Sequence, residues 1–305
     1  MLTSNYITTP EDPPVGPLLS LGLSFDILVP ASHTAPVVFA SPHSGRRYPA
    51  EFLAVSRLDA TAIRRSEDAF VDELFASAPL FGAPLIRAHM PRAYIDMNRG
   101  PYELDPAMFI DALPMYANTS SPRVAAGLGT VARIVASGEP IYQRKLLVAD
   151  ALTRIENYHI PYHLALSQLM METQERFGGC LLVDCHSMPS SGRSIGHDTD
   201  GQPADMILGD RHGVACHPAI IDVTELTLRD MGYVVHRNVP YAGGYSTCHY
   251  GRPADGLHAI QIEINRGLYM DESRITRSPG FMALTHNLEN LIKVLTGLNP
   301  KQLPL

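Results

Sequence analysis

The sequence lacks the features that mark secreted, membrane and nucleic-acid-binding proteins. Its four cysteines form no C-x-x-C pair, so we expect no disulfide framework and place the chain in the reducing cytoplasm. No apolar run approaches the roughly 18 residues of a membrane-spanning helix, so no membrane is expected as a partner. The formal net charge of −7 shows no basic surplus, which disfavours nucleic acid as a partner. This charge still allows a small basic pocket for an acidic substrate.

We expect no secretory signal, because residues 1–18 have no basic start followed by an apolar core. Residues 1–20 are rich in Pro, Ser and Thr without periodicity, and we expect residues 1–30 to form a peripheral arm. The 305 residues suffice for one large α/β domain. Without an internal repeat or a biased linker, the sequence predicts a single domain over 1–305 and leaves the oligomeric state open.

Two apolar, strand-like runs each lead to a histidine. The run 180–183 leads to His186, and the run 36–41 leads to His43. Short apolar runs bounded by turn residues are typical of buried strands. In an open α/β sheet, ligands bind just beyond the carboxyl ends of the strands. The two histidines therefore indicate a candidate metal site at one edge of the sheet.

Apolar periodicity predicts helices and strands that alternate along the rest of the chain. Helices are expected over 58–78, 142–158, 162–177, 218–231 and 281–298. Further strands are expected over 84–89, 93–97, 232–239 and 258–264. Pro161 should separate two of the helices, while 100–138 and 190–213 should form loops near the site. This alternation favours an α/β domain with a mixed or parallel sheet.

A small set of polar residues could carry metal-dependent chemistry. The set is His43, His186, Glu263 and one of the neighbouring acids Glu67 and Asp68. A catalytic zinc needs three nitrogen or oxygen ligands and an open fourth position, while a separate carboxylate carries the proton. Glu263 suits that second role because it lies inside the apolar run 260–264, where a buried carboxylate needs an explanation. The alternative is that the histidines are ordinary hydrogen-bonding residues, since no compact H-E-x-x-H motif exists.

A second group of polar residues flanks the run 93–97. Arg92 precedes this run, and Asn98 and Arg99 follow it. Arginine binds carboxylates through two parallel hydrogen bonds, and asparagine can add a directional one. These residues are therefore candidates for gripping an acidic substrate, with Asp96 as an orienting partner. The alternative is a surface or inter-strand ion pair.

The remaining reactive side chains are weaker candidates. His249 lies in the glycine-preceded run 243–251, where it could bind the substrate or cap a turn. Cys185 should point to the strand face opposite its two neighbours, which indicates packing and argues against a cysteine nucleophile. Ser44 and Ser187 lack a G-x-S-x-G context, so a serine hydrolase is not expected.

Six motifs together resemble the N-formylglutamate amidohydrolase family. They are SPHSG (41–45), EDAFVDELF (67–75), RAYIDMNRG (92–100), DCHSMP (184–189), GGYSTCHYG (243–251) and HAIQIEINRGLYMDE (258–272). The motifs occur in the family's order, and the resemblance extends from about residue 35 to 295. The family looks related to zinc carboxypeptidases and aspartoacylases. The resemblance thus implies a three-layer α/β/α sandwich around a mixed, mostly parallel sheet.

The resemblance also implies a site and a reaction. It implies Zn²⁺ held by His43, an acidic residue and His186, with Glu263 as the catalytic base. It further implies that Asn98 and Arg99 grip a substrate carboxylate and that Arg92 polarises the scissile carbonyl. The implied reaction is hydrolysis of an acidic N-acyl amino acid, with N-formyl-L-glutamate as lead substrate, giving formate and glutamate. The alternatives are another zinc N-acyl amino acid hydrolase, a carboxypeptidase-like peptidase, or a non-catalytic ligand-binding member.

The sequence departs from the carboxypeptidase pattern at one position. Arg46 stands three residues after His43, where the H-x-x-E ligand pair would require glutamate. The acidic ligand must therefore come from elsewhere, and the family's acid before an apolar helix face points to Asp68, with Glu67 as the alternative. None of the motifs contains a residue that recognises the substrate's side chain, so the sequence does not identify the acyl group or the amino acid.

Overall fold

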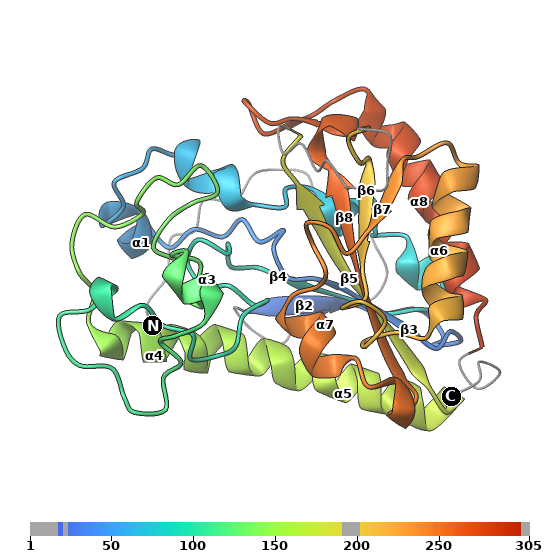
Figure 1. Cartoon of the computed structure of the whole chain (residues 1–305), viewed down its shortest axis with the longest axis horizontal. Coiled ribbons are helices and arrows are strands. Elements are labelled where there is room, and N and C mark those ends of the chain that lie inside the picture. The colour runs from blue at the N-terminus through green and yellow to red at the C-terminus, as the bar shows by residue number, and fades with distance from the viewer. Residues whose placement is uncertain (1–17, 21–23, 191–201, 300–305) are drawn as a thin grey trace.

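A twisted sheet of eight strands forms the centre of the described chain (Figure 1). The computed structural model describes residues 18–20, 24–190 and 202–299. The strands are β1 (Leu18–Ser20), β2 (Phe25–Leu28), β3 (Val37–Ser41), β4 (Leu85–Ala88), β5 (Cys180–Met188), β6 (Met206–Gly209), β7 (Val235–Arg237) and β8 (Leu257–Asn265). Their order across the sheet is β1-β2-β4-β3-β5-β8-β6-β7.

The sheet is mixed, with its parallel strands in the middle. β3 runs parallel to β4 and β5, and β5 runs parallel to β8. The antiparallel pairs are β1 with β2, β2 with β4, and β6 with β8, while β6 and β7 are parallel. β5 is buried along its whole length, as a central strand covered on both faces should be. The predicted mixed, mostly parallel sheet is confirmed.

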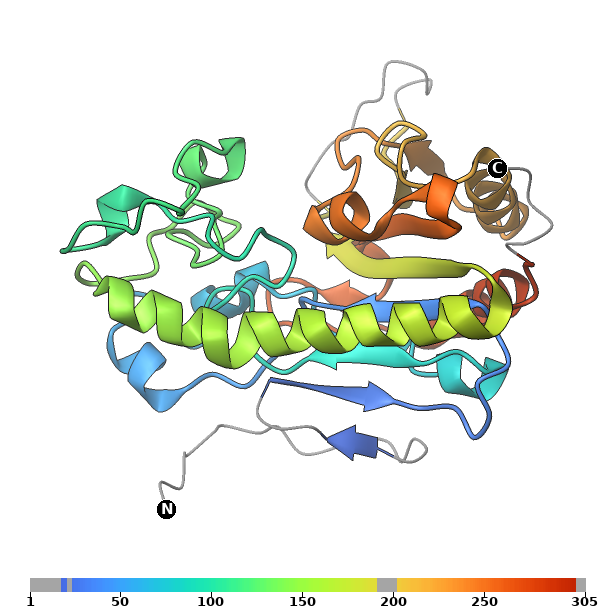
Figure 2. The ribbon, with the colours of Figure 1, turned by 90° about the horizontal axis from the view of Figure 1, so that it is seen from below.

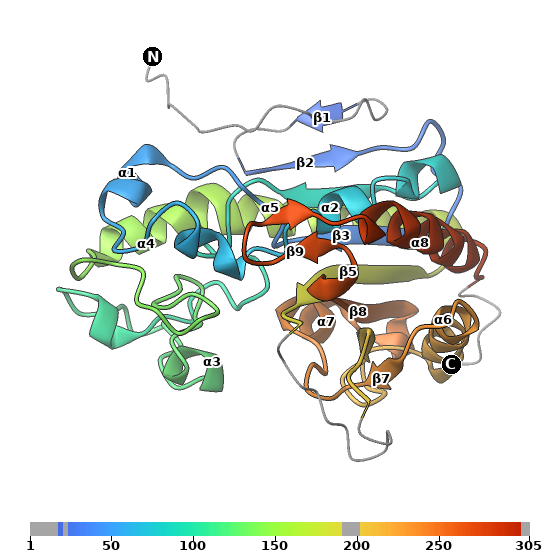
Figure 3. The same ribbon diagram turned by 90° about the horizontal axis from the view of Figure 1, so that it is seen from above.

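Helices cover both faces of the sheet. On one face, α4 (Val148–Arg154), the π-helical turn η4 (Ile155–His159) and α5 (Ile160–Phe177) form one long helix (Figure 2). On the other face lie α2 (Val71–Leu74), α6 (Pro218–Asp230) and α8 (Gly280–Thr296) (Figure 3). Successive residues of a strand pack on opposite faces of the sheet, where each face has its own hydrophobic core. Val38 packs toward α5, whereas Phe39 packs in the core of the α8 layer. The predicted three-layer α/β/α sandwich is confirmed.

Short elements complete the described chain, and none of its helices is long and apolar enough to cross a membrane. They are α1 (Ala50–Ala54), η1 (Ala62–Ser66), η2 (Ala78–Phe81), η3 (Pro106–Met108), α3 (Pro122–Ala125), α7 (Tyr245–Tyr250), η5 (Pro253–Asp255), η6 (Arg266–Leu268), β9 (Met270–Asp271) and β10 (Thr276–Arg277). The segment 100–147 contains α3 and η3 and is otherwise irregular, as expected for 100–138, whereas the helix expected from 142 begins only at Val148. In Figure 2 it forms the green lobe toward which the yellow arrow of β5 points.

Part of the predicted N-terminal arm is an inner strand of the sheet. Residues 1–17 and 21–23 of the expected arm 1–30 lie outside the described residues, but β2 pairs with β4 and is buried throughout. The prediction of a peripheral arm is therefore wrong for Phe25–Leu28. A charged residue in this short run, Asp26, obscured the strand pattern. Its carboxylate is neutralised by Arg87 of β4, whose Nε lies 2.7 Å from Oδ1.

The predicted helix over 58–78 is also wrong, because the chain breaks it at the candidate site. η1 ends at Ser66, and α2 begins only at Val71, after Phe70 adopts a left-handed φ of 66°. Between them, the backbone N–H of Asp68 donates to the carbonyl of His43 at 3.1 Å. This bond replaces a helical one and turns the acidic residue toward the histidine.

Four other local predictions differ from the structure: a strand over 93–97, loops over 190–213 and 243–251, and a helix break at Pro161. The run 93–97 forms turns and no strand, and the run 243–251 contains the helix α7. The predicted loop 190–213 contains β6, while 191–201 lie outside the described residues. Pro161 does not interrupt the long helix, because the π-helical turn η4 immediately before it accommodates the missing N–H.

Candidate functional site

Three polar residues from separate elements meet beside the carboxyl ends of β3 and β5. His43 follows β3, His186 lies near the end of β5, and Asp68 occupies the break between η1 and α2. All three side chains are buried, and their ligand atoms lie within 4.8 Å of one another. The neighbouring, parallel positions of β3 and β5 explain why two histidines distant in sequence come together.

One carboxylate oxygen faces both imidazole rings. Asp68 Oδ2 lies 2.9 Å from Nδ1 of His186 and 3.3 Å from Nδ1 of His43. The His43 Nδ1 atom is buried and has no hydrogen-bond partner, which is costly for a polar atom unless another ligand satisfies it. Two imidazole nitrogens and one carboxylate oxygen are a donor set that suits zinc. This cluster could therefore hold a metal ion.

Further carboxylates fix the orientation of the two rings. The Nε2 atom of His43 lies 2.7 Å from Asp96 Oδ1, and Nε2 of His186 lies 3.0 Å from Asp184 Oδ2. A carboxylate on the far nitrogen of an imidazole sets its tautomer and aims the other nitrogen at a metal. The Nδ1 atoms of both rings are directed toward Asp68.

Asp68, and not its neighbour Glu67, faces the histidines. Glu67 accepts two hydrogen bonds from Arg64, at 2.9 and 3.0 Å, and one from the hydroxyl of Tyr48 at 2.6 Å. The second oxygen of Asp68, Oδ1, accepts from Nη2 of Arg266 at 3.1 Å. That bond leaves Oδ2 of Asp68 for the centre of the cluster.

The local electrostatics favour positive charge in this cluster. Burial alone lowers the pKa of His186, but the carboxylates of Asp184 and Asp68 outweigh burial and hold that pKa well above its usual value. Burial alone raises the pKa of Asp68, but its interactions with His186 and His43 keep it well below the usual range. An environment that stabilises an imidazolium in this way also suits a divalent cation.

Glu263 lies on β8 directly opposite His186, its register partner on β5. The side chain is 8% exposed, and its Oε1 accepts a hydrogen bond from Nε2 of Gln261 at 2.8 Å. The other end of that amide accepts from the backbone N–H of Gly244 at 2.7 Å. Burial raises the pKa of Glu263 to about 7. A carboxylate with a pKa near neutrality can accept a proton from water and return it.

Comparison with known proteins identifies the family of this chain. The family model of N-formylglutamate amidohydrolases matches residues 35–270, which include every residue of the cluster and Glu263. The chain belongs to the N-formylglutamate amidohydrolase family.

Individual relatives agree with this assignment. The crystal structure of N-formylglutamate amidohydrolase from Ralstonia eutropha is 36% identical, with a TM-score of 0.85, over 92% of this chain and 99% of that one. The N-formylglutamate deformylases of Pseudomonas putida and Pseudomonas aeruginosa are each 28% identical over 78% of this chain and 83% of theirs. A gene product of Agrobacterium tumefaciens, 18% identical with a TM-score of 0.60, shares the fold over 90% of this chain and 95% of its own.

In this amidohydrolase, Arg92 lies within electrostatic reach of the cluster. Its Nη2 donates to Asp96 Oδ2 at 2.9 Å. Burial lowers the pKa of Arg92, but the charges of Asp96, Asp68 and Glu263 together raise it. The guanidinium group is thus held near the predicted base by the same carboxylate that orients His43.

Asn98 supports the cluster directly. Its Nδ2 lies 3.0 Å from Asp184 Oδ2 and 2.9 Å from Nε2 of His186, while its Oδ1 accepts from the N–H of Ser246 at 2.8 Å. A Cβ at Gly244 would lie 2.5 Å from this amide nitrogen, so only glycine allows α7 to begin so close to the site. The predicted contact of Asn98 with a substrate carboxylate stays a prediction.

Arg99 and His249 also stay predictions as substrate contacts. The Nε and Nη1 atoms of Arg99 donate to the carbonyls of Leu128 at 2.7 Å and Asn98 at 2.6 Å, and Nη2 lies 3.7 Å from Asp96. His249 is exposed on α7, where its ring stacks on Tyr245 with centroids 5.0 Å apart.

Two supporting interactions were not expected from the sequence. His159 and His163, one turn apart on the long helix, place Nε2 at 2.9 Å from the carbonyl of Arg99 and 2.7 Å from that of Met97. These bonds fix the backbone on both sides of Asn98. The sequence signal for this pair was the spacing of four residues between His159 and His163, which places both on one face of a helix. The only sequence signal for the bond between Gln261 and Glu263 was that the two residues lie two positions apart and so share one face of a strand.

Proposed function

We propose that this chain hydrolyses the amide bond of an acidic N-acyl amino acid, with N-formyl-L-glutamate as lead substrate, giving formate and glutamate. The observation that carries the proposal is the pair of Nδ1 atoms directed at one oxygen of Asp68, beside a buried carboxylate whose pKa lies near 7. Family membership supports the same reaction, as the two Pseudomonas relatives are named N-formylglutamate deformylases.

His43, Asp68 and His186 would hold the metal, which we propose is Zn²⁺. When bound, such a cation supplies Lewis acidity and lowers the pKa of water to roughly 7. Glu263 takes a proton from the attacking water as the oxygen bonds to the acyl carbon. It then returns a proton to the amine nitrogen as the carbon–nitrogen bond breaks. Gln261 holds the carboxylate of Glu263 in place throughout.

Arg92 and the pair Asn98 and Arg99 complete the proposed site. Arg92 stabilises the negative charge that develops on the acyl oxygen. Nε2 of His186 carries the proton that Asp184 accepts, so it takes no hydrogen from Asn98, and one amide hydrogen of Asn98 is left for a substrate carboxylate. Nη2 of Arg99, beyond hydrogen-bond distance of Asp96, supplies a second donor.

Two further proposals concern the surroundings of the reaction. We place His249 at the substrate entrance, where its exposed ring on α7 is supported by Tyr245. We keep the cytoplasm as the compartment, and the support is that the thiols of Cys180, Cys185, Cys216 and Cys248 are all free. Cys185 packs in the core of the α8 layer, as its alternation on the strand predicts.

A substrate panel tests the proposed function. The protein is chelated, reloaded with Zn²⁺, and assayed for release of free amine from N-formyl and N-acetyl amino acids and short peptides. We expect N-formyl-L-glutamate to give the highest kcat/KM, and chelation to abolish its hydrolysis reversibly. A higher kcat/KM for a different acyl amino acid or for a peptide would identify that compound as the substrate in place of N-formyl-L-glutamate. Absence of hydrolysis across the panel, at full zinc occupancy, would support a non-catalytic ligand-binding role.

A further inference from the structure

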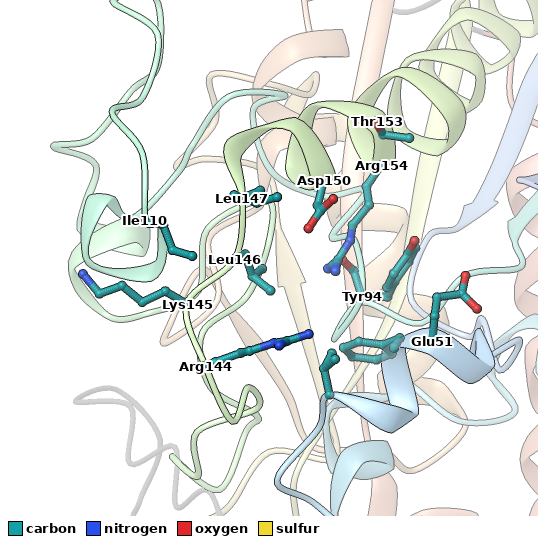
Figure 4. A pocket seen from close by; sticks show the side chains of 12 residues that line it. Glu51, Tyr94, Ile110, Arg144, Lys145, Leu146, Leu147, Asp150, Thr153 and Arg154 are labelled. Atoms are coloured by element: carbon teal, nitrogen blue, oxygen red, sulfur yellow. The ribbon is translucent and has the colours of Figure 1, made fainter.

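A second pocket lies away from the metal cluster (Figure 4). Its volume is about 560 Å³, within the roughly 300–1,000 Å³ typical of small-molecule sites. Its walls come from α1, Tyr94, the stretch 144–147 and α4, and none of the proposed metal ligands, nor Glu263, lines it. The pocket is therefore separate from the site of the proposed hydrolysis.

The inner wall of this pocket carries a buried cation, Arg154, which is 7% exposed. Its guanidinium carbon lies 4.2 Å from the ring centroid of Tyr94, and Nη1 donates to the Tyr94 carbonyl at 3.2 Å and the Tyr142 hydroxyl at 2.7 Å. Within the described residues, Arg154 forms no ion pair with a carboxylate. Burial alone lowers the pKa of Arg154, but Tyr142 and Tyr94, with a smaller contribution from Asp150 one turn earlier on α4, raise it. Buried charge without an ionic partner is costly, so the group suits an anion supplied from outside.

A second arginine converges on the same space. In Figure 4 the guanidinium groups of Arg144 and Arg154 point toward the middle of the pocket from two sides. Arg144 is exposed and, like the neighbouring Lys145, has no ion-pair partner among the described residues. Two guanidinium groups directed at one space provide the forked donors that recognise a carboxylate.

The rest of the lining limits the charge and the shape of the occupant. The lining contains three cations, Arg144, Lys145 and Arg154, and two carboxylates, Glu51 and Asp150, which leaves one excess positive charge and matches a monoanion better than a dianion. The uncharged part of the lining is mostly apolar, formed by Phe52, Ile110 and Leu146 among others. An apolar body therefore gains from burial where a plain inorganic anion would not.

We propose that this pocket is a second ligand site, which binds a monocarboxylate with an apolar body between Arg144 and Arg154. The carboxylate lies between the two guanidinium groups, and the apolar body packs on Phe52 and Leu146. The site does not depend on the metal cluster or on the proposed hydrolysis.

Calorimetric titration of the full chain with 4-phenylbutyrate tests the proposal, with the neutral 4-phenylbutyramide as matched probe. We expect saturable binding of the carboxylate and binding of the amide at least about tenfold weaker, as loss of a charge-assisted hydrogen bond implies. Chelated protein should bind 4-phenylbutyrate equally well, which separates this pocket from the metal cluster. Equal affinities for acid and amide, or loss of binding on chelation, would overturn the proposal.

Variants locate the binding. Arg144→Gln should weaken 4-phenylbutyrate binding about tenfold, while Arg274→Gln, an exposed arginine outside the pocket, should leave it unchanged. Arg154→Gln should weaken binding at least as much, and its thermal unfolding shows whether the buried substitution is tolerated. Arg144 is exposed, so its variant tests the site even if the Arg154 variant does not fold. Unaltered affinity of Arg144→Gln would place the ligand elsewhere and reject the site.

Discussion

The identity of the acidic ligand depends on the conformation of a single residue pair. Glu67 and Asp68 are chemically similar neighbours, and local sequence offers no reason for only one of them to face His43. The bond from the Asp68 N–H to the His43 carbonyl, together with the bonds of Glu67 to Arg64 and Tyr48, turns the two side chains in different directions. The contacts with His43 and Tyr48 join residues far apart in the sequence, so they could not be predicted from a local pattern.

Paired variants test this assignment. Asp68→Asn should weaken Zn²⁺ binding by at least about tenfold, because even the outer partners of metal ligands are worth about 10–100-fold. Glu67→Gln should leave the zinc affinity unchanged, although it removes charge from the Arg64 and Tyr48 contacts. Competition with a chromogenic chelator measures both affinities. Equal losses in the two variants would contradict the separation of roles.

Glu263 is the residue on which turnover should depend most directly. Glu263→Gln keeps the shape and the bond with Gln261 but cannot accept a proton, so kcat should fall about 10²–10⁴-fold. Zinc content, measured by elemental analysis, should equal that of the wild type. Glu172→Gln, on the exposed face of α5, provides the matched control. A kcat close to the wild-type value would assign the proton transfer to another group.

At the scale of elements, most helices and the central strands follow from periodicity, but the segment around Asp68 and the strand β2 do not. β5, β8, α6 and α8 occupy nearly the predicted ranges, because their apolar residues pack into one continuous core. The predicted helix over 58–78 fails because Asp68 must leave the helical path to reach His43. β2 was missed because its buried charge is balanced by a residue on another strand.

The ion pair between β2 and β4 makes a pH-dependent contribution to stability. Burial alone raises the pKa of Asp26, but bonds with His89 and Arg87 outweigh it and lower the pKa from 3.8 to about 2. Because this pKa is lower in the folded than in the unfolded chain, the ionised carboxylate stabilises the fold at pH values above the unfolded pKa. That contribution is lost as the pH falls through about 2. Asp26→Asn should therefore cost about 2 kcal/mol at pH 7 and clearly less near pH 2.5. Urea unfolding at both pH values measures the difference, and an equal cost at each would argue against the ion pair as its cause.

At the scale of the whole molecule, the cluster joins segments that lie far apart in the sequence. His43, Asp68 and His186 belong to three elements, and Asp96 and Asn98 support them from a fourth segment. A metal bound to the folded chain stabilises it by mass action, about 2.7 kcal/mol at a free ion concentration 100 times Kd. Metal binding should thus couple to the global unfolding equilibrium.

Chelation should lower the thermal unfolding midpoint of the wild-type protein, because Zn²⁺ binds the folded chain and not the dispersed ligands. Restoring Zn²⁺ should raise the midpoint again. Differential scanning calorimetry with and without chelator measures the change, and Asp68→Asn should show a much smaller one. An identical midpoint for zinc-loaded and chelated wild-type protein would mean that the cluster does not hold the ion tightly.

The sequence by itself determined that the runs 36–41, 180–183 and 258–264 form buried strands and that histidines lie at the ends of two of the three. These features depend on apolar patterns between near neighbours. Its ordered motifs also indicated the family. Only the tertiary structure decided that β3 and β5 are adjacent, that Asp68 faces both histidines, and that Arg154, which forms no ion pair with a carboxylate of the described residues, lines a pocket apart from the cluster. Strand order and the environment of a side chain depend on packing between distant segments, and local patterns do not encode those distances.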